Sequence, residues 1–469
     1  MGRTTASCRT VLGLFFAISG ALISNASPNN YDASNYPTSD VVTRDVCVIG
    51  GGSSGTYAAI RLRDLGHSVV VVEAQDRLGG HTETYEDPVT KGTIDIGVIE
   101  FHNTDIVKNY FARFNVSLTK ATFSTAGQVT EYVDYKTAKK VTGYTPTDPT
   151  AALKTYTAQL AKYPYLTPGF NLTYPVPNDL VLPFGDFVKK YDLGDLVMTI
   201  FNYGQGIGDL LAHPTVYVMK LIGLDTLANI QTGFLTTTRN DNSELYDKAR
   251  AELKDDVLLS SRVVHVDRSV NDHTKVWVQG PSGVKLIKAK KILIAIPPKL
   301  DNLNGFDLSK SERSLFSQFG NSGYYTGVLR NAGIPDNVSI TNIGPHTLYN
   351  LPALPAVYGI SSTGVPGLHN VKYGSPSTLP AAQVEADIVA SVKRLTSPKT
   401  KPEFAIFKAH TPFELTVSPA AIKNRFYEKL YALQGQRNTF YTGAAFHTQD
   451  SSLLWEFTEA LLDDITGWF

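Results

Sequence analysis

Three glycines with the spacing Gly-x-Gly-x-x-Gly are the residues of this chain whose pattern most clearly suits a chemical task. In such a turn Gly50 permits the sharp bend, Gly52 lets the backbone approach a pyrophosphate, and Gly55 lets a helix pack closely on a strand. Ser54 lies inside the turn, where the expected helix begins. Free backbone N–H groups and the helix dipole favour an anion there. The spacing therefore predicts a dinucleotide-binding site.

The elements that must position this turn are a strand before it and a helix and a second strand after it. Apolar residues at 46–49 and 69–72 suit two strands of a parallel sheet, with a helix between them. The second strand ends on Glu73, followed by Ala74. A carboxylate at this point can accept hydrogen bonds from ribose hydroxyls, and it disfavours the 2′-phosphate of NADP.

The residues after Glu73 distinguish NAD from FAD. They continue as Glu-x-x-x-Arg-x-Gly-Gly, with Arg77, Gly79 and Gly80 at the fixed positions. From Gly50 to Gly80 the pattern resembles the extended signature of the FAD-dependent amine oxidase superfamily. The resemblance implies FAD as the cofactor. It also implies an α/β fold, with a Rossmann-like FAD-binding domain of the glutathione-reductase-like, amine oxidase type and an interleaved α+β substrate domain.

The same resemblance divides the chain into segments. We expect a discontinuous FAD-binding domain from residues 44–104, 232–298 and 435–469, and a substrate or cap domain from residues 105–231 and 299–434. The stretch from 105 to about 235 reads as a largely helical cap. One strand is expected at 257–266, and a last helix at 453–465 with Asp450 or Ser451 as its N-cap.

Further motifs, at 182–187 and 434–443, resemble the β-cyclopiazonate dehydrogenase (oxidocyclase) family of fungal secondary metabolism and the flavin-dependent polyunsaturated fatty acid isomerase. The resemblance places the backbone of Val263 beside the adenine. It also directs the N–H groups of the last helix, at Leu453, toward the flavin. The remaining cofactor contacts that it implies lie in the glycine turn after the last strand, at Gly443 and Ala444.

The chain departs from the superfamily at three points. Ala444 stands where relatives often carry an acidic residue. No cysteine lies near the last helix, so we expect FAD to be bound non-covalently. Tyr325 occupies the strand position near the flavin where amine oxidases typically have a lysine, and this argues against ordinary amine oxidation.

These features predict an enzyme, an FAD-dependent oxidoreductase (oxidase or dehydrogenase). We expect it to oxidise a hydrophobic secondary metabolite by hydride transfer to flavin, with oxidative cyclisation as a possible outcome. Only one dinucleotide motif is found, so oxygen or another acceptor is expected to reoxidise the flavin. The alternatives are a redox-neutral double-bond isomerase of unsaturated fatty acids and a non-catalytic flavin carrier. The side chains considered as the base are Glu100, His102, Tyr325, His410 and His447.

Composition excludes several other classes of protein. Lysine plus arginine equals aspartate plus glutamate, 43 each, so no net charge attracts nucleic acid or an anionic membrane. The two cysteines, Cys8 and Cys47, cannot form a cysteine-rich metal site, and no metal is expected. The expected partner is a small-molecule substrate.

The first 26 residues read as a secretory signal peptide. Arg3 and Arg9 come before an apolar run at 11–23, and small residues follow it. A retained membrane anchor is the alternative, but the run is short for a bilayer span. Glycosylation acceptors at Asn115, Asn171 and Asn337 agree with a secretory route. We therefore expect a secreted glycoprotein, or one held in the lumen of the ER or a vesicle.

Overall fold

The strand, turn, helix and strand expected at the start of the chain are present. The computed structural model describes residues 31–122, 127–269 and 272–467; the expected signal peptide lies outside them. Strand β1 (Val41–Ile49) pairs in parallel with β2 (Val69–Val72), and α1 (Ser53–Asp64) connects them. All four residues of β2 are buried, as a parallel strand covered on both faces requires.

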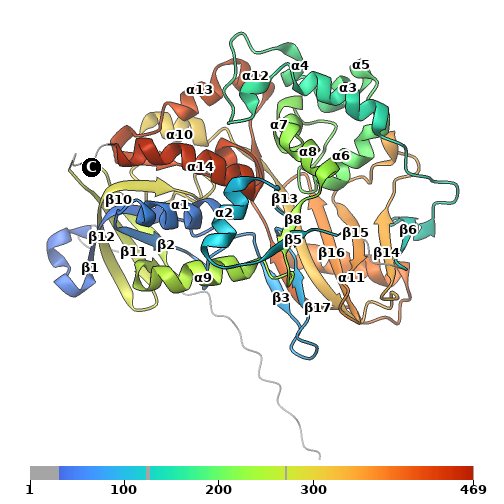
Figure 1. Ribbon diagram of the computed structural model, residues 1–469, viewed down its shortest axis with the longest axis horizontal. Coiled ribbons are helices and arrows are strands. Elements are labelled where there is room, and N and C mark those ends of the chain that lie inside the picture. The colour runs from blue at the N-terminus through green and yellow to red at the C-terminus, as the bar shows by residue number, and fades with distance from the viewer. Residues whose placement is uncertain (1–30, 123–126, 270–271, 468–469) are drawn as a thin grey trace, which may run out of the picture.

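This unit forms part of a seven-stranded sheet, on the left in Figure 1. The strand order is β10-β11-β12-β1-β2-β9, and β19 (Thr439–Tyr441) also pairs with β12. The other members are β9 (Val257–Leu258), β10 (Arg262–Asp267), β11 (Thr274–Gly280) and β12 (Gly283–Ile294). The expected Rossmann-like fold is confirmed, because β1 has parallel neighbours on both sides and the glycine turn follows its carboxyl end.

The expectation of a single strand at 257–266 was wrong. It is divided into β9, which pairs with β2, and β10, which pairs with β11. Ser260 interrupts it with a φ of +48°, and the backbone N–H groups of Ser260 and Ser261 donate to the carbonyls of Gln75 and Glu73. These bonds tie the connection to the end of β2.

A second sheet of eight strands lies at the lower right of Figure 1. Its order is β17-β13-β16-β15-β14-β6-β7, and β18 (Phe413–Thr416) also pairs with β13. Helix α11 (Ala381–Leu395) packs on one face of it through Val384, Ile388 and Val392. The bounds of the other strands are β6 (Val129–Asp134), β7 (Lys139–Lys140), β13 (Gly320–Arg330), β14 (Val338–Asn342), β15 (Ala356–Ser362), β16 (Leu368–Ser375) and β17 (Glu403–Ala409).

The segment after residue 105, expected to be a largely helical cap, contains a group of helices but also contributes β6 and β7 to the second sheet. β6 pairs in parallel with β14, so residues far apart in sequence complete one sheet. The helices α3 to α8 lie above this sheet in Figure 1. They are α3 (Thr150–Leu160), α4 (Asn178–Val181), α5 (Phe184–Tyr191), α6 (Val197–Tyr203), α7 (Thr215–Leu221) and α8 (Leu224–Thr232), preceded by α2 (Asp105–Arg113).

The last helix, α14 (Ser451–Thr466), packs beside α1. The indole of Trp455 stacks on Tyr57 at 5.7 Å between ring centroids, and Arg61 forms an ion pair with Glu459 at 3.0 Å. The N- and C-terminal parts of the chain therefore stabilise each other around the glycine turn. The remaining elements are β3 (Thr84–Glu86), β4 (Thr93–Asp95), β5 (Leu118–Lys120), β8 (Leu235–Thr237), α9 (Ser243–Leu253), α10 (Lys310–Phe316), α12 (Pro419–Lys423) and α13 (Phe426–Tyr431).

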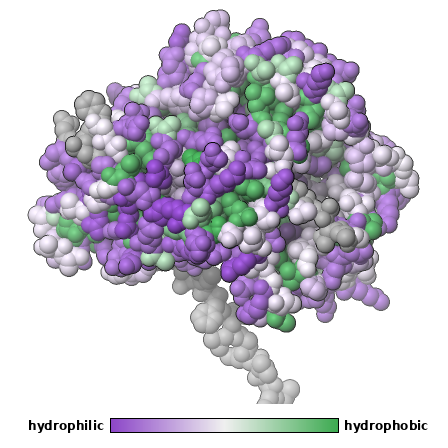
Figure 2. Space-filling view, in the orientation of Figure 1, coloured by the Kyte–Doolittle hydropathy of each residue, from purple (hydrophilic) through white to green (hydrophobic). Residues whose placement is uncertain are grey.

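Among the described residues, no helix combines the length and the apolar composition that a membrane span requires. Hydrophobic residues on the face shown in Figure 2 form scattered patches between hydrophilic ones.

Candidate functional site

The glycine turn lies between β1 and α1, and two of its glycines are required by the fold itself. Gly50 has a φ of +102°, and a Cβ built on it would lie 2.6 Å from Cγ2 of Ile296. A Cβ on Gly55 would lie 1.9 Å from the carbonyl oxygen of Gly50, so α1 can pack this closely only on a glycine. At Gly52 the nearest atom to such a Cβ is 3.8 Å away, an ordinary contact.

Glu73 follows β2, is buried, and lines the same cavity as the glycine turn. The backbone N–H of Gly51 donates to its Oε2 at 2.6 Å, and that of Gln75 donates to its Oε1 at 2.7 Å. These two bonds fix the carboxylate at the end of the strand. Each oxygen retains a lone pair that can accept a hydrogen bond from a ribose hydroxyl.

Arg77 holds the loop that follows. Its guanidinium donates to the carbonyls of Gly80 and Thr82, both at 2.8 Å, and forms an ion pair with Glu83. A Cβ on Gly80 would lie 2.9 Å from Cα of Gly52, so the two glycine loops touch. Arg77 itself is not among the residues that line the cavity. Its place in the structure is to support Gly79 and Gly80, which are.

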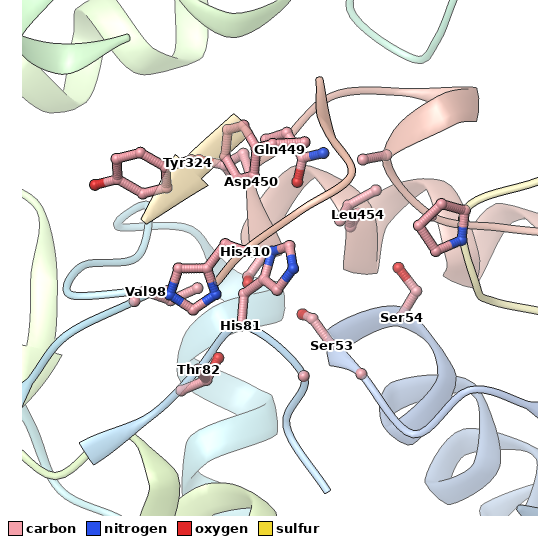
Figure 3. A pocket seen from close by; sticks show the side chains of 18 of the residues that line it. Ser53, Ser54, His81, Thr82, Val98, Tyr324, His410, Gln449, Asp450 and Leu454 are labelled. Carbon is pink, nitrogen blue, oxygen red and sulfur yellow. The ribbon is translucent and has the colours of Figure 1, made fainter. Parts of the chain in front are cut away.

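A cavity of about 700 Å³ extends from this cradle to the space between the helical cap and the second sheet. Figure 3 shows its centre, where Ser53 and Ser54 of α1 lie on one side and Tyr324 of β13 on another. Gly443 and Ala444 contribute to the wall near the cradle. The wall away from the cradle has apolar side chains from Leu221, Ile222, Phe234, Tyr324, Phe413 and Leu415, and it also includes the polar residues Asn202, Gln205 and Thr226.

The cradle fits a dinucleotide. Oγ of Ser53 and Oγ1 of Thr82 are buried, lie near the hydroxyl of Tyr246 and lack a well-formed hydrogen bond, so they can still bind a ligand. Helix α1 has Gly52 as its N-cap and therefore no capping side chain. Its first N–H groups can bind phosphate oxygens.

Besides Arg77, four more residues expected to touch the cofactor lie outside the cavity wall. Gly55 supports the turn from behind, while Ala74 is exposed and Gln75 lines the cavity in its place. Val263 lies on β10, which the break at Ser260 separates from β9. The N–H of Leu453 donates to the N-cap carboxylate of Asp450 at 3.0 Å, so Asp450, Ser451 and Leu454 of this helix end face the cavity instead.

Two of the five residues considered as the base, Glu100 and His410, line the cavity. Burial raises the pKa of Glu100 to about 7, although the charge of Lys372 opposes this rise. Oε2 of Glu100 is buried without a protein partner among the described residues. The carboxyl group is therefore poised to exchange a proton near neutral pH.

His410 lies beside His81 in the middle of the cavity, with 4.6 Å between ring centroids (Figure 3). Burial lowers the pKa of both imidazoles, that of His81 to about 4, so both are neutral at pH 7. Nε2 of His410 is 3.0 Å from the hydroxyl of Thr326. His81 was not among the sequence candidates, although it directly follows Gly80 of the FAD signature.

The structure corrects the expected position of Tyr325. Successive side chains of a strand point to opposite faces, and on β13 it is Tyr324 that faces the cavity. Tyr325 points toward α11, where its hydroxyl donates to the carbonyl of Leu379 at 2.9 Å and accepts from the N–H of Leu379 at 2.7 Å. Its surroundings are those of a buried, fully bonded structural residue.

His102 and His447 also lie outside the cavity wall. Nε2 of His102 is 3.2 Å from Oδ2 of Asp450, and although burial lowers the pKa of His102, the charge of Asp450 raises it overall. Nε2 of His447 is 2.8 Å from the carbonyl oxygen of Thr167 and 3.1 Å from Nζ of Lys220. Burial lowers the pKa of His447 to about 3.

Comparison with known proteins identifies the family. Residues 48–114 match the model of an NAD(P)-binding Rossmann-like domain. The chain is 45% identical to the FAD-dependent oxidoreductase oblC of Cochliobolus heterostrophus, over 88% of this chain and 89% of that protein. The chain belongs to this family of FAD-dependent oxidoreductases. It is also 37% identical to the β-cyclopiazonate dehydrogenase of Aspergillus oryzae, over 90% of this chain and 93% of that protein.

Solved structures agree on the fold of this FAD-dependent oxidoreductase. The CLA-producing fatty acid isomerase from P. acnes matches with a TM-score of 0.74 at 18% identity, over 90% of this chain and 99% of that one. Putrescine oxidase bound to putrescine matches with a TM-score of 0.64 at 17% identity, over 91% and 100%. The fold is therefore of the amine oxidase type, as expected.

FAD supplies the oxidising power of such an enzyme by accepting two electrons with a proton as hydride. The residues of this oxidoreductase that would hold it are those of the cradle, with Glu73 for the ribose and the start of α1 for the phosphates.

Like His81, the cavity residue Lys372 was missed by sequence reasoning. It lies on β16 opposite Thr326 of β13, between Val371 and Tyr373. A lysine within a strand that is otherwise largely buried is the only signal that the sequence offers for it.

Proposed function

We propose that this oxidoreductase removes a hydride from a hydrophobic secondary metabolite. The observation that carries the proposal is the continuity of the cavity, which joins the dinucleotide cradle to an apolar chamber. The chamber has Phe234 and Ile222 from the cap on one side and Tyr324 and Phe413 from the second sheet on the other. Such walls exclude water and favour an apolar ligand over a polar one.

Oxidative ring closure is the extension of this proposal. An electron-deficient carbon that forms on hydride loss can be attacked by a nucleophilic part of the same molecule if water is excluded. The name of the relative from Aspergillus oryzae identifies it as a dehydrogenase of β-cyclopiazonate. That name supports an organic metabolite as the class of substrate.

The cofactor is proposed to be bound non-covalently. Of the two cysteines in the sequence, Cys47 is the one that the structure describes, and it is fully buried in β1. Burial raises the pKa of its thiol to about 12, which leaves it protonated and unreactive. FAD should therefore be released intact when the protein is denatured.

We further propose a secretory route and oxygen, or another non-nicotinamide acceptor, as the oxidant of the reduced flavin. The N-terminal pattern supports the route, and the side chains of Asn115, Asn171 and Asn337 are all exposed, as glycan attachment requires. A shift in mass after treatment with an N-glycosidase would test the glycans, and the N-terminal sequence of the mature protein would test cleavage.

The purified protein should be yellow and should lose its 450 nm absorbance lastingly when it is mixed with substrate without oxygen. Screening oxygen uptake against prenylated indoles, terpenoids and unsaturated fatty acids would identify the substrate class. Unchanged absorbance with a displaced double bond would instead support the isomerase, and a yellow protein without turnover would support the carrier. A protein that neither contains nor binds FAD would contradict the proposal.

A further inference from the structure

Two of the polar residues that line the chamber carry opposite charges and come from different parts of the chain. Glu100 belongs to the loop after β4, and Lys372 to β16 of the second sheet; both line the cavity. Their charges interact, but within the described part of the chain Lys372 has neither an ion pair nor a hydrogen bond. Oε2 of Glu100 is likewise without a partner there. A bound ligand is therefore the natural partner of both groups.

The charged groups around this pair are few. Besides Lys372, the charges of Asp450 and His102 also shift the pKa of Glu100, and these two residues are paired with each other. Glu100 is the one charged residue that acts on Lys372 among the described residues. Burial lowers the pKa of the lysine amine, and Glu100 offsets part of that shift. The chamber thus holds a lysine that can donate hydrogen bonds and a carboxyl group that can take up a proton near neutral pH.

This arrangement disfavours a substrate with an ammonium group. A cation at Glu100 would meet the positive charge of Lys372, and Asp450, the other carboxylate that acts on Glu100, is already paired with His102. A ligand oxygen suits the site better, because Lys372 can donate a hydrogen bond to it and Glu100 can accept its proton. An acidic O–H, as in a phenol or an enol, provides such a group together with an apolar body.

We propose that the substrate presents a phenolic or enolic O–H to this pair: the Glu100 carboxylate accepts its proton as the conjugated carbon loses hydride, and the ammonium group of Lys372 donates a hydrogen bond to the same oxygen. The O–H bond breaks, its electron pair becomes the π bond of a carbonyl, and the proton forms a new O–H bond on Glu100. The C–H bond of the conjugated carbon breaks, and both its electrons leave with the hydrogen as hydride, which bound FAD would accept. This inference rests on the proposed function and adds the substrate class and the base.

A phenol whose ionisation is visible tests the inference without turnover. 4-Nitrophenol is added to the FAD-loaded full-length protein, and the phenolate absorbance near 400 nm is titrated against pH as a difference spectrum. In the wild type we expect the pKa of the bound phenol to fall by about one to three pH units, because a cation lies beside its oxygen. Lys372→Met should remove this shift.

Lys291→Met is the matched control, because Lys291 is a buried lysine on β12 that does not line the cavity. It should leave the shift unchanged. The inference is overturned if the FAD-loaded wild type does not bind 4-nitrophenol or binds it without a shift, if Lys372→Met retains the shift, or if benzylamine binds more tightly than the phenol. A protein that binds no FAD overturns the proposed function instead, and this is seen before the probe is added.

Discussion

Replacement of Gly52 by alanine should separate what the fold requires from what the cofactor requires. Gly52 has a φ of −71°, which any residue adopts, and a Cβ built on it meets only Cα of Gly80, at 3.8 Å. The one cost to the folded protein is an alanine in place of glycine as the N-cap of α1, about 1 kcal/mol or less. The added methyl group would, however, project into the cavity where a pyrophosphate must approach the backbone.

Gly55→Ala provides the contrast. Its methyl group would lie 1.9 Å from the carbonyl oxygen of Gly50, so α1 must move by about 1 Å away from β1. Overpacking of this kind costs about 1–3 kcal/mol of folding free energy. In Gly52→Ala the methyl group would clash only with bound FAD. A clash of the same 1–3 kcal/mol in that complex would weaken FAD binding by about 5- to 150-fold.

The assay has two readouts for each variant. Thermal unfolding of the FAD-free protein measures stability, and quenching of flavin fluorescence measures FAD affinity. We expect Gly52→Ala to unfold close to the wild-type temperature yet bind FAD weakly, and Gly55→Ala to unfold at a clearly lower temperature. The reasoning would be refuted if Gly52→Ala bound FAD within about threefold of wild type, because a 1 kcal/mol clash already exceeds that factor.

Three further predictions concern individual side chains. Glu312→Gln should destabilise the protein by about 1.5–3 kcal/mol in urea unfolding at pH 7, because the buried guanidinium of Arg268 loses its charged hydrogen bonds to Glu312, although it keeps Asp307, also 2.7 Å away, as a carboxylate partner. Burial would raise the pKa of Glu312, but Arg268 and Tyr441 lower it to about 2, so this contribution should be lost as pH falls from about 4.5 toward 2. Glu100→Gln should raise the melting temperature at pH 8 but not at pH 4. Native Glu100 keeps its proton up to about pH 7, whereas the unfolded chain releases it near the ordinary pKa of 4.5, so above pH 7 this residue lowers the free energy of unfolding by at most about 3 kcal/mol. An equal effect at both pH values would contradict this. Tyr325→Phe should lower the free energy of unfolding in urea by about 1–3 kcal/mol, because its two hydrogen bonds are lost, and should leave FAD affinity unchanged. Tyr324→Phe should leave the free energy of unfolding within about 1 kcal/mol of wild type. The opposite ranking would show that the assignment of faces on β13 is wrong.

The part of the site that could be predicted is contiguous in the chain. The residues from Val41 to Gly80 form a strand, a turn, a helix, a second strand and a loop whose spacing is set by local geometry, so the glycine spacing and Glu73 identify the cradle without any distant contact. The N-cap of α14 was predicted for the same reason, since a capping carboxylate acts on an N–H three residues later.

Register and packing decided the rest. Whether Tyr324 or Tyr325 faces the cavity depends on how β13 pairs with β16, because a shift of one residue reverses every side chain of a strand. The interruption at Ser260 depends on hydrogen bonds to residues at the end of β2, which no local pattern shows.

The sequence by itself determined the cofactor, the Rossmann-like fold and the family. The tertiary structure alone decided the chemistry of the chamber, because Glu100 and Lys372 come from distant parts of the chain and meet only when the loop after β4 lies against the second sheet. The physical reason is that a phosphate cradle is made by backbone groups of neighbouring residues. A substrate chamber is made instead by side chains whose direction and burial depend on the packing of whole domains.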